Sequence, residues 1–95
     1  MQGAWLYIIT NRPNGTLYTG TTTDLIRRTW EHREGVGGSF AAKHDLNRLV
    51  YYEHHETLAG ARQRELNMKH WPRAWKARLI LDFNPSWTDL YEALL

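Results

Sequence analysis

The chain has 95 residues, of which 42% are hydrophobic and none is cysteine, and its formal net charge is only +2. This length predicts one domain covering residues 1–95, and the missing cysteine excludes disulfides and thiolate chemistry. The longest apolar run, residues 4–9, is too short to cross a bilayer, and no signal peptide is visible. We therefore expect a cytoplasmic protein with no membrane partner.

The chain opens with the pattern of a β-hairpin. Residues 3–10 are apolar on both faces, which is typical of a central strand. Asn14–Gly15 is the usual two-residue hairpin turn and predicts antiparallel pairing with a second strand, residues 17–19. Gly20 is expected to end that strand, because glycine tolerates an unusual backbone angle or the close approach of a bulky group. The hairpin brings two aromatic side chains into one neighbourhood, those of Tyr7 and Tyr18.

A helix is predicted over residues 24–33, with Thr23 or Asp24 as its N-cap. Arg28 and His32 are four residues apart and therefore share one helix face. A tyrosine at a strand end beside a guanidinium and an imidazole suits a phosphate. The helix is expected to contact the sheet through its apolar residues, Leu25, Ile26 and Trp30.

The rest of the chain predicts one more strand and mainly helices. After a glycine-rich loop come a short helical turn over 39–42, a strand over 48–53 and a helix over 58–70 capped by Thr57. Glu65 falls on the inward stripe of that helix, with Leu58, Ala61 and Met68. A third helix runs from Pro72 to near Asp82 with Trp75, Leu79 and Ile80 as its core face, and a short one covers 89–94. The fold class is α+β, a small, mainly antiparallel three-stranded sheet flanked by helices.

Basic residues gather in the second half of the chain. Between residues 61 and 78 the only acid is Glu65, whereas the basic residues are Arg62, Arg64, Lys69, Arg73, Lys76 and Arg78. This skew indicates a polyanion such as nucleic acid, and its alternative is an ordinary solvated helix surface. Phe40 and Lys43, after the glycine-rich loop, are predicted to contact DNA, with packing and surface exposure as their alternatives.

Several positions, in order, resemble the GIY-YIG nuclease family. The first family triplet is represented by Trp5-Leu6-Tyr7 and the second by Tyr18-Thr19-Gly20. Arg28 stands ten residues after the second tyrosine, where the family has its catalytic arginine, and His32 follows one turn later. Glu65 matches the metal-binding glutamate, and Asn84 matches a late asparagine that we expect to support the site. The resemblance covers nearly the whole chain and is closest to small stand-alone bacterial members.

The resemblance implies a DNA endonuclease that uses a single Mg²⁺ or Mn²⁺ ion held by Glu65. Arg28 would hold a phosphate through paired hydrogen bonds, and Tyr7 would activate or orient the water. Tyr18 would be a phosphate or water ligand, and His32 a proton carrier or second phosphate donor. We expect DNA binding mainly through phosphates, with little sequence preference. The residues predicted to contact the nucleic acid are Gly20, Arg27, Phe40, Lys43, Arg62 and Lys69.

Other functions stay open at this point. Some family members, including the excision-repair nuclease, have a lysine where this chain has Thr21. The missing lysine favours an alternative, a catalytically weak or inactive module that binds DNA or recognises its structure. The many aromatic residues are also compatible with a protein-interaction domain. A zinc site is disfavoured, because no tetrahedral spacing is found among its candidate ligands, His44, His54, His55 and Glu56.

Overall fold

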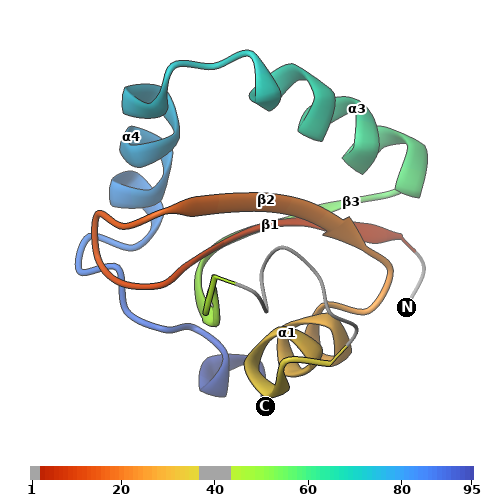
Figure 1. Cartoon of the computed structure of the whole chain (residues 1–95). Coiled ribbons are helices and arrows are strands. Elements are labelled where there is room, and N and C mark those ends of the chain that lie inside the picture. The colour runs from red at the N-terminus through yellow and green to blue at the C-terminus, as the bar shows by residue number, and fades with distance from the viewer. Residues whose placement is uncertain (1–2, 37–43) are drawn as a thin grey trace.

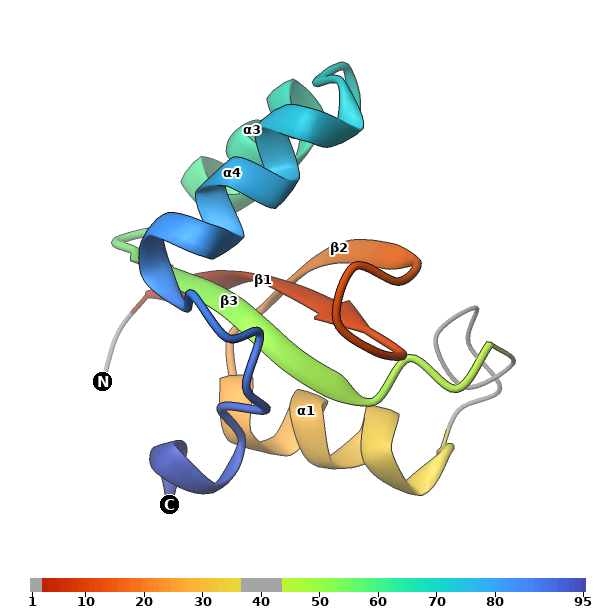
Figure 2. The same cartoon turned by 90° about the vertical axis from the view of Figure 1, so that its left-hand side faces the viewer.

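The computed structural model of the chain describes residues 3–36 and 44–95, and it has helices on both faces of a three-stranded sheet (Figures 1 and 2). The α+β class predicted from the sequence is confirmed. The predicted turn over 39–42, with Phe40 and Lys43, lies outside the described residues. In chain order, the elements are β1 (Ala4–Thr10), β2 (Leu17–Thr22), α1 (Leu25–Glu34), β3 (Arg48–His55), α3 (Leu58–Lys69), α4 (Arg73–Phe83) and the 3₁₀ turn η1 (Glu92–Leu94).

The sheet is antiparallel with the order β2-β1-β3, so β1 is central, as its apolar pattern predicted. Leu6 and Ile8 pack toward α3 and α4, and Tyr7 and Ile9 pack toward α1. Figure 2 shows the two helix layers on opposite faces of the sheet. Because both faces of β1 are covered, the five successive residues from Leu6 to Thr10 are almost completely buried.

A bulge in β3 adjusts its side chains to the two layers. The register shifts between Ile8 and Ile9, so that Tyr51 lies opposite Ile8 and Leu49 opposite Ile9. Val50 is the extra residue, and it joins Tyr51 in the cluster under α3 and α4, whereas Leu49 joins the cluster on the α1 side.

The hairpin differs from the predicted two-residue turn. Thr10 pairs with Leu17, so six residues connect the strands. Pro13 has a fixed φ and sits second in a turn closed by the Gly15 amide donating to the Arg12 carbonyl at 2.9 Å. Asn14 then takes the left-handed position, with φ 58°. β2 continues through Gly20 to Thr22, and the prediction that Gly20 ends the strand was wrong.

The predicted N-caps are present, but some predicted core faces were wrong. Asp24 caps α1 and Thr57 caps α3 through their side chains. On α1 the buried residues are Leu25, Thr29 and His32, whereas Ile26 and Trp30 are 42% and 45% exposed. Thr29 can face the sheet because its hydroxyl donates to the Leu25 carbonyl at 2.7 Å.

Of the three core residues predicted for α4, two are confirmed and one was wrong. Ile80 is the buried residue of α4 and Leu79 packs partly against the core, whereas Trp75 is 59% exposed. A single 3₁₀ turn, η1, replaces the helix predicted over 89–94. In the described parts of the chain, no helix combines the length and apolar character that crossing a membrane requires.

Candidate active site

Gly20 lets Tyr7 reach the outer edge of the sheet. The two residues are paired across β1 and β2, and β2 is an edge strand. A Cβ atom at Gly20 would lie 2.6 Å from the Tyr7 hydroxyl oxygen and 2.7 Å from Cζ. The backbone of Gly20 is not in the left-handed region, so glycine is needed here for space. The tyrosine ring therefore passes over Gly20, and the Tyr7 side chain stays buried, with only 1% of its surface exposed.

Two side chains of α1 meet the Tyr7 hydroxyl there. Its oxygen lies 2.8 Å from His32 Nε2, and it also forms a hydrogen bond with the Arg28 guanidinium. Arginine can only donate, so the tyrosine oxygen is the acceptor toward Arg28. The hydroxyl donates to Nε2 in the tautomer that carries the imidazole proton on Nδ1, and accepts from Nε2 in the other. The Tyr18 ring packs edge-on against the imidazole, with ring centroids 5.9 Å apart.

Burial keeps the phenol and the imidazole neutral. Desolvation raises the pKa of Tyr7 to about 12, although the hydrogen bond and charge of Arg28 act in the opposite direction. Desolvation and then the Arg28 charge lower the pKa of His32 to about 4. At neutral pH the site therefore holds an uncharged tyrosine and an uncharged histidine beside one fixed positive charge.

Glu31 orients the arginine. Its Oε1 accepts a hydrogen bond from Arg28 Nη1 at 3.0 Å, one turn along α1. Burial lowers the pKa of Arg28, but hydrogen bonds to Glu31 and Tyr7 more than offset this, and the net pKa is raised. The Arg28 side chain stays 31% exposed, so part of its guanidinium is open to a ligand.

Glu65 lies on α3, on the opposite face of the sheet from Arg28, and contacts the residue of β2 that follows Gly20. Thr21 follows Gly20 on β2 and points toward α3, where its hydroxyl donates to Glu65 Oε1 at 3.4 Å. The negative charge of Glu65 contributes to the raised pKa of Tyr7, as does the neighbouring Tyr18. The structure therefore groups Tyr7, Tyr18, Arg28 and His32 on the α1 face of the sheet, whereas Glu65 lies on the α3 face beside Thr21.

Comparison with known proteins identifies the family of this chain. A family profile described as the GIY-YIG catalytic domain matches residues 3–78. The chain belongs to the GIY-YIG family. It is 40% identical over 67 residues to a UPF0213 protein of Natronomonas pharaonis, covering 70% of this chain and 79% of that protein. It is 35% identical over 80 residues to a UPF0213 protein of Staphylococcus aureus, covering 84% and 96%, respectively. No solved structure matches.

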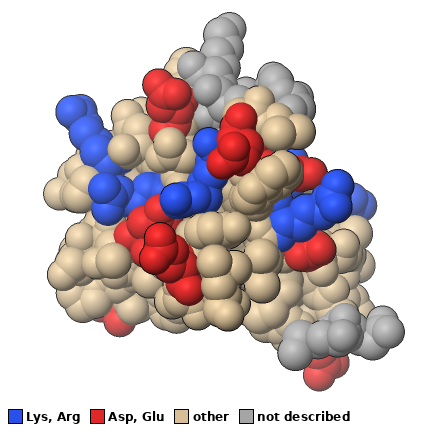
Figure 3. All heavy atoms as spheres, turned by 90° about the horizontal axis from the view of Figure 1, so that it is seen from below, with Lys and Arg blue, Asp and Glu red and all other residues tan. Residues whose placement is uncertain are grey.

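The predicted nucleic-acid contacts of this GIY-YIG chain divide into two groups. Arg62 and Lys69 are exposed and lie one turn before and after Glu65 on the same side of α3. Arg27 is not brought to the Tyr7 hydroxyl: it points to solvent, with its side chain 73% exposed and paired with Glu31 at 3.5 Å. Figure 3 shows basic and acidic side chains interspersed on the α1 side of the molecule.

Asn84 is built into the fold and lies away from this hydroxyl. Its side chain is buried, donates to the carbonyls of Val50 and Thr88 at 3.2 and 2.8 Å, and accepts from the Thr88 amide at 3.2 Å. It therefore joins the end of α4 to β3, and its support for the site acts through the sheet.

The donor set fits a hard divalent cation better than zinc. Across 3–36 and 44–95 no group of three or more His, Cys, Asp or Glu side chains could hold a metal together. Glu65 is one carboxylate at a partly open strand edge, which suits Mg²⁺, since that ion keeps most of its water and takes substrate oxygens. The histidines weighed for zinc are engaged elsewhere: His55 Nε2 contacts Glu53 Oε2 at 2.5 Å, and the His54 ring packs on Trp5.

Two residues of the site were missed from the sequence. Glu31 could have been found, because it lies three positions after Arg28 on the predicted helix. Thr21 was noted only as the replacement of a lysine. Strand alternation after Gly20 places it on the α3 side, but its contact with Glu65 depends on where α3 crosses the sheet.

Proposed function

We propose that this protein is a metal-dependent endonuclease that hydrolyses DNA phosphodiester bonds with little sequence preference. The observation that carries the proposal is the surroundings of the Tyr7 hydroxyl, which lies against His32 Nε2 and Arg28 and senses the charge of Glu65. Membership of a nuclease family makes hydrolysis the natural reaction of such a site. The cytoplasmic location stays a prediction.

Tyr7 and His32 would act together on the attacking water. A tyrosine with a pKa of about 12 is a poor base by itself. In the tautomer that leaves Nε2 unprotonated, its hydroxyl can accept a proton from water while passing its own to Nε2. The water oxygen then bonds to phosphorus as the bond to the leaving sugar oxygen breaks, and that oxygen takes a proton from solvent water. Desolvation is the main cause of the low pKa of His32, and the Arg28 charge adds to it. A bound phosphate would offset the Arg28 charge and so make the imidazole a better proton acceptor.

Arg28 and Glu65 would stabilise the phosphate from two sides. The exposed part of the guanidinium can donate two parallel hydrogen bonds to phosphate oxygens, and Glu31 keeps it oriented. A Mg²⁺ or Mn²⁺ ion, when held by Glu65, would neutralise charge on the same phosphate. His32 is only 3% exposed, which favours its role as a proton carrier over that of a phosphate donor.

Plasmid nicking tests the proposal. Supercoiled DNA is incubated with the protein and Mg²⁺ or Mn²⁺, and conversion to relaxed and linear forms is followed on gels. Glu65→Gln keeps the shape of the side chain, and we expect it to lower the rate at least about 10²-fold. Glu34→Gln, an exposed carboxylate at the end of α1, is the matched control and should cleave normally. Cleavage that survives Glu65→Gln, or that EDTA leaves unchanged, would rule out the assigned role of Glu65.

One observation favours the alternative of a DNA-binding module with little turnover. Thr21 provides no positive charge at its position and instead binds the carboxylate proposed to hold the metal. Salt-sensitive DNA binding, without cleavage in the presence of any divalent metal, would select this alternative.

Similar cleavage of unrelated plasmids would support low sequence preference, whereas a few discrete cut sites would contradict it.

A further inference from the structure

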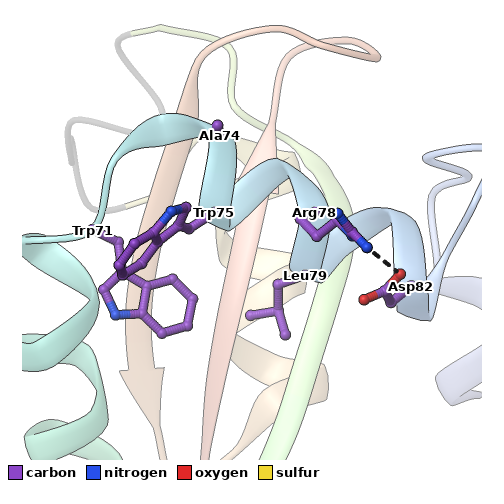
Figure 4. Close-up of a pocket in the computed structure, with 6 residues that line it drawn as sticks. All are labelled: Trp71, Ala74, Trp75, Arg78, Leu79 and Asp82. Atoms are coloured by element: carbon purple, nitrogen blue, oxygen red, sulfur yellow. Dashed lines mark ion pairs between the residues drawn. The ribbon is translucent and has the colours of Figure 1, made fainter.

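A second surface, on the other side of α3, combines exposed aromatic rings with positive charge. We call it the tryptophan groove. It is a hollow of about 430 Å³ in the angle between the end of α3 and the face of α4, and Figure 4 shows the side chains that line it. They are Trp71, Ala74, Trp75, Arg78, Leu79 and Asp82.

The rings are held in place but not covered. The Trp71 and Trp75 rings meet edge-on with centroids 5.9 Å apart, and the Arg64 guanidinium lies 5.1 Å from the Trp71 ring centroid. Trp71 packs against the core, whereas Trp75 is 59% exposed. Together with Leu79, the two tryptophans make a contiguous apolar hollow, and an exposed patch of this kind marks a candidate binding surface.

Positive charge surrounds the tryptophan groove. A neighbouring hollow of about 390 Å³ is lined by Trp71 together with Arg73, Lys76, Thr16 and Leu17. Arg73 is fixed by donating to the carbonyls of Asn14 and Gly15, at 3.0 and 2.6 Å. Arg78 adds a further charge, which Asp82 offsets only in part, since their 4.0 Å contact is largely exposed to solvent. Charge of this sign beside aromatic faces is complementary to a nucleic-acid strand.

The neighbouring hollow, which shares Trp71 with the tryptophan groove, lies along the same strand edge as the candidate active site. Leu17, in the neighbouring hollow, is four positions before Thr21, and both side chains point to the α3 side of β2. The separation is about 13 Å at 3.3 Å per residue. This corresponds to roughly four nucleotides of a stacked strand.

We propose that the tryptophan groove binds unpaired bases of single-stranded DNA, a few nucleotides away from the phosphate at Glu65. This inference rests on the proposed nuclease function and specifies its substrate as DNA that carries a single-stranded stretch. Bases in a duplex have both faces stacked and cannot reach Trp75, whereas unpaired bases can. A second copy of the chain fits less well, because a symmetric contact through this face would bring Arg73, Lys76 and Arg78 close to their own copies.

Fluorescence anisotropy tests the proposal without depending on cleavage. The probes are a labelled oligodeoxythymidylate of about 20 nucleotides, a blunt duplex of equal length and an oligouridylate. All are measured with the full chain carrying Glu65→Gln, in EDTA. We expect Trp75→Ala to weaken binding of the oligodeoxythymidylate about tenfold and duplex binding less than about twofold. Trp75→Phe should retain most of the affinity. Trp30→Ala, at a comparably exposed tryptophan on α1, is the matched control and should bind like the parent.

Three results would overturn the proposal. The first is equal binding by Trp75→Ala and its parent, or an equal loss on single strand and duplex. The second is tighter, Trp75-dependent binding of the oligouridylate, which would replace DNA by RNA. The third is a dimer, detected by sedimentation, that Trp75→Ala converts to monomers, which would make a second copy of the chain the occupant of the groove.

Because binding is measured separately from cleavage, Trp75-dependent binding without plasmid nicking would refute only the nuclease proposal. Nicking that Trp75→Ala leaves unchanged on DNA with single-stranded stretches would refute only the groove.

Discussion

Gly20→Ala should disable the site while adding only one methyl group. The new Cβ would lie 2.6 Å from the Tyr7 hydroxyl oxygen, and ordinary contact begins at 3.4 Å, so the ring must move by about 0.8 Å. Tyr7 is 1% exposed and held by its core cluster, so this shift has a cost of about 1–3 kcal/mol in stability. The same shift can lengthen the 2.8 Å contact with His32 to about 3.6 Å, where it is no longer a hydrogen bond.

We expect the nicking rate of Gly20→Ala to fall about 10²-fold, because displacing a reacting group by about 1 Å can lower a reaction rate by that factor. Gly35→Ala is the control: its φ of 71° makes alanine unfavourable by about 1–2 kcal/mol, but nothing lies within 4 Å of the added Cβ. Urea unfolding and nicking rates are measured for both. If Gly20→Ala is destabilised no more than Gly35→Ala and nicks DNA as fast as Gly35→Ala does, then Gly20 is not needed to make room for the Tyr7 ring.

Three further substitutions separate the remaining roles. The pKa of His32 is about 4 in the folded protein and 6.5 in the unfolded chain, so the unfolded chain binds more protons between these pH values. The wild type should therefore lose about 3 kcal/mol of stability as the pH falls from 6.5 to 4. Urea unfolding should show that His32→Gln lacks this dependence of stability on pH, and an equal dependence in both proteins would contradict the prediction. Arg28→Lys should reduce nicking about 10²-fold, since lysine cannot donate in parallel pairs, while Arg12→Lys, in the exposed hairpin loop, should not. Asn84→Ala should lower the free energy of unfolding by about 1–3 kcal/mol without changing the rate constant of the folded protein; a lower rate constant would make Asn84 part of the site.

Hydrophobic periodicity predicted the parts of the fold where burial is simple. It identified β1 as central because both of its faces are apolar, and it put Glu65 beside the inward stripe of α3. It failed on α1, where Thr29 is buried through a hydrogen bond within its own helix and Trp30 is left outside. It failed again at Trp75, because a large aromatic residue was assumed to be buried.

The residues of the site came from family resemblance, but their arrangement required the sheet. Arg28 and Glu65 lie on opposite faces of the sheet, and spacing along the chain does not reveal that the charges of both act on the pKa of Tyr7. That arrangement depends on β2 being the edge strand and on Gly20 leaving room for the Tyr7 ring. Neither the strand order nor the direction in which a core tyrosine points can be obtained from local sequence alone.

The segment after α4 has a practical consequence for anyone who would trim this protein. The family profile ends at residue 78, and every residue proposed for catalysis precedes that point. Yet Ile80 and Trp87 complete the core beneath α3 and α4, and Asp89 joins Leu49 of β3 to Arg33 of α1. A fragment ending at residue 78 would therefore keep every residue proposed for catalysis but lose the contacts that hold α1, the helix of Arg28, to the sheet. We expect such a fragment to be unfolded when it is expressed.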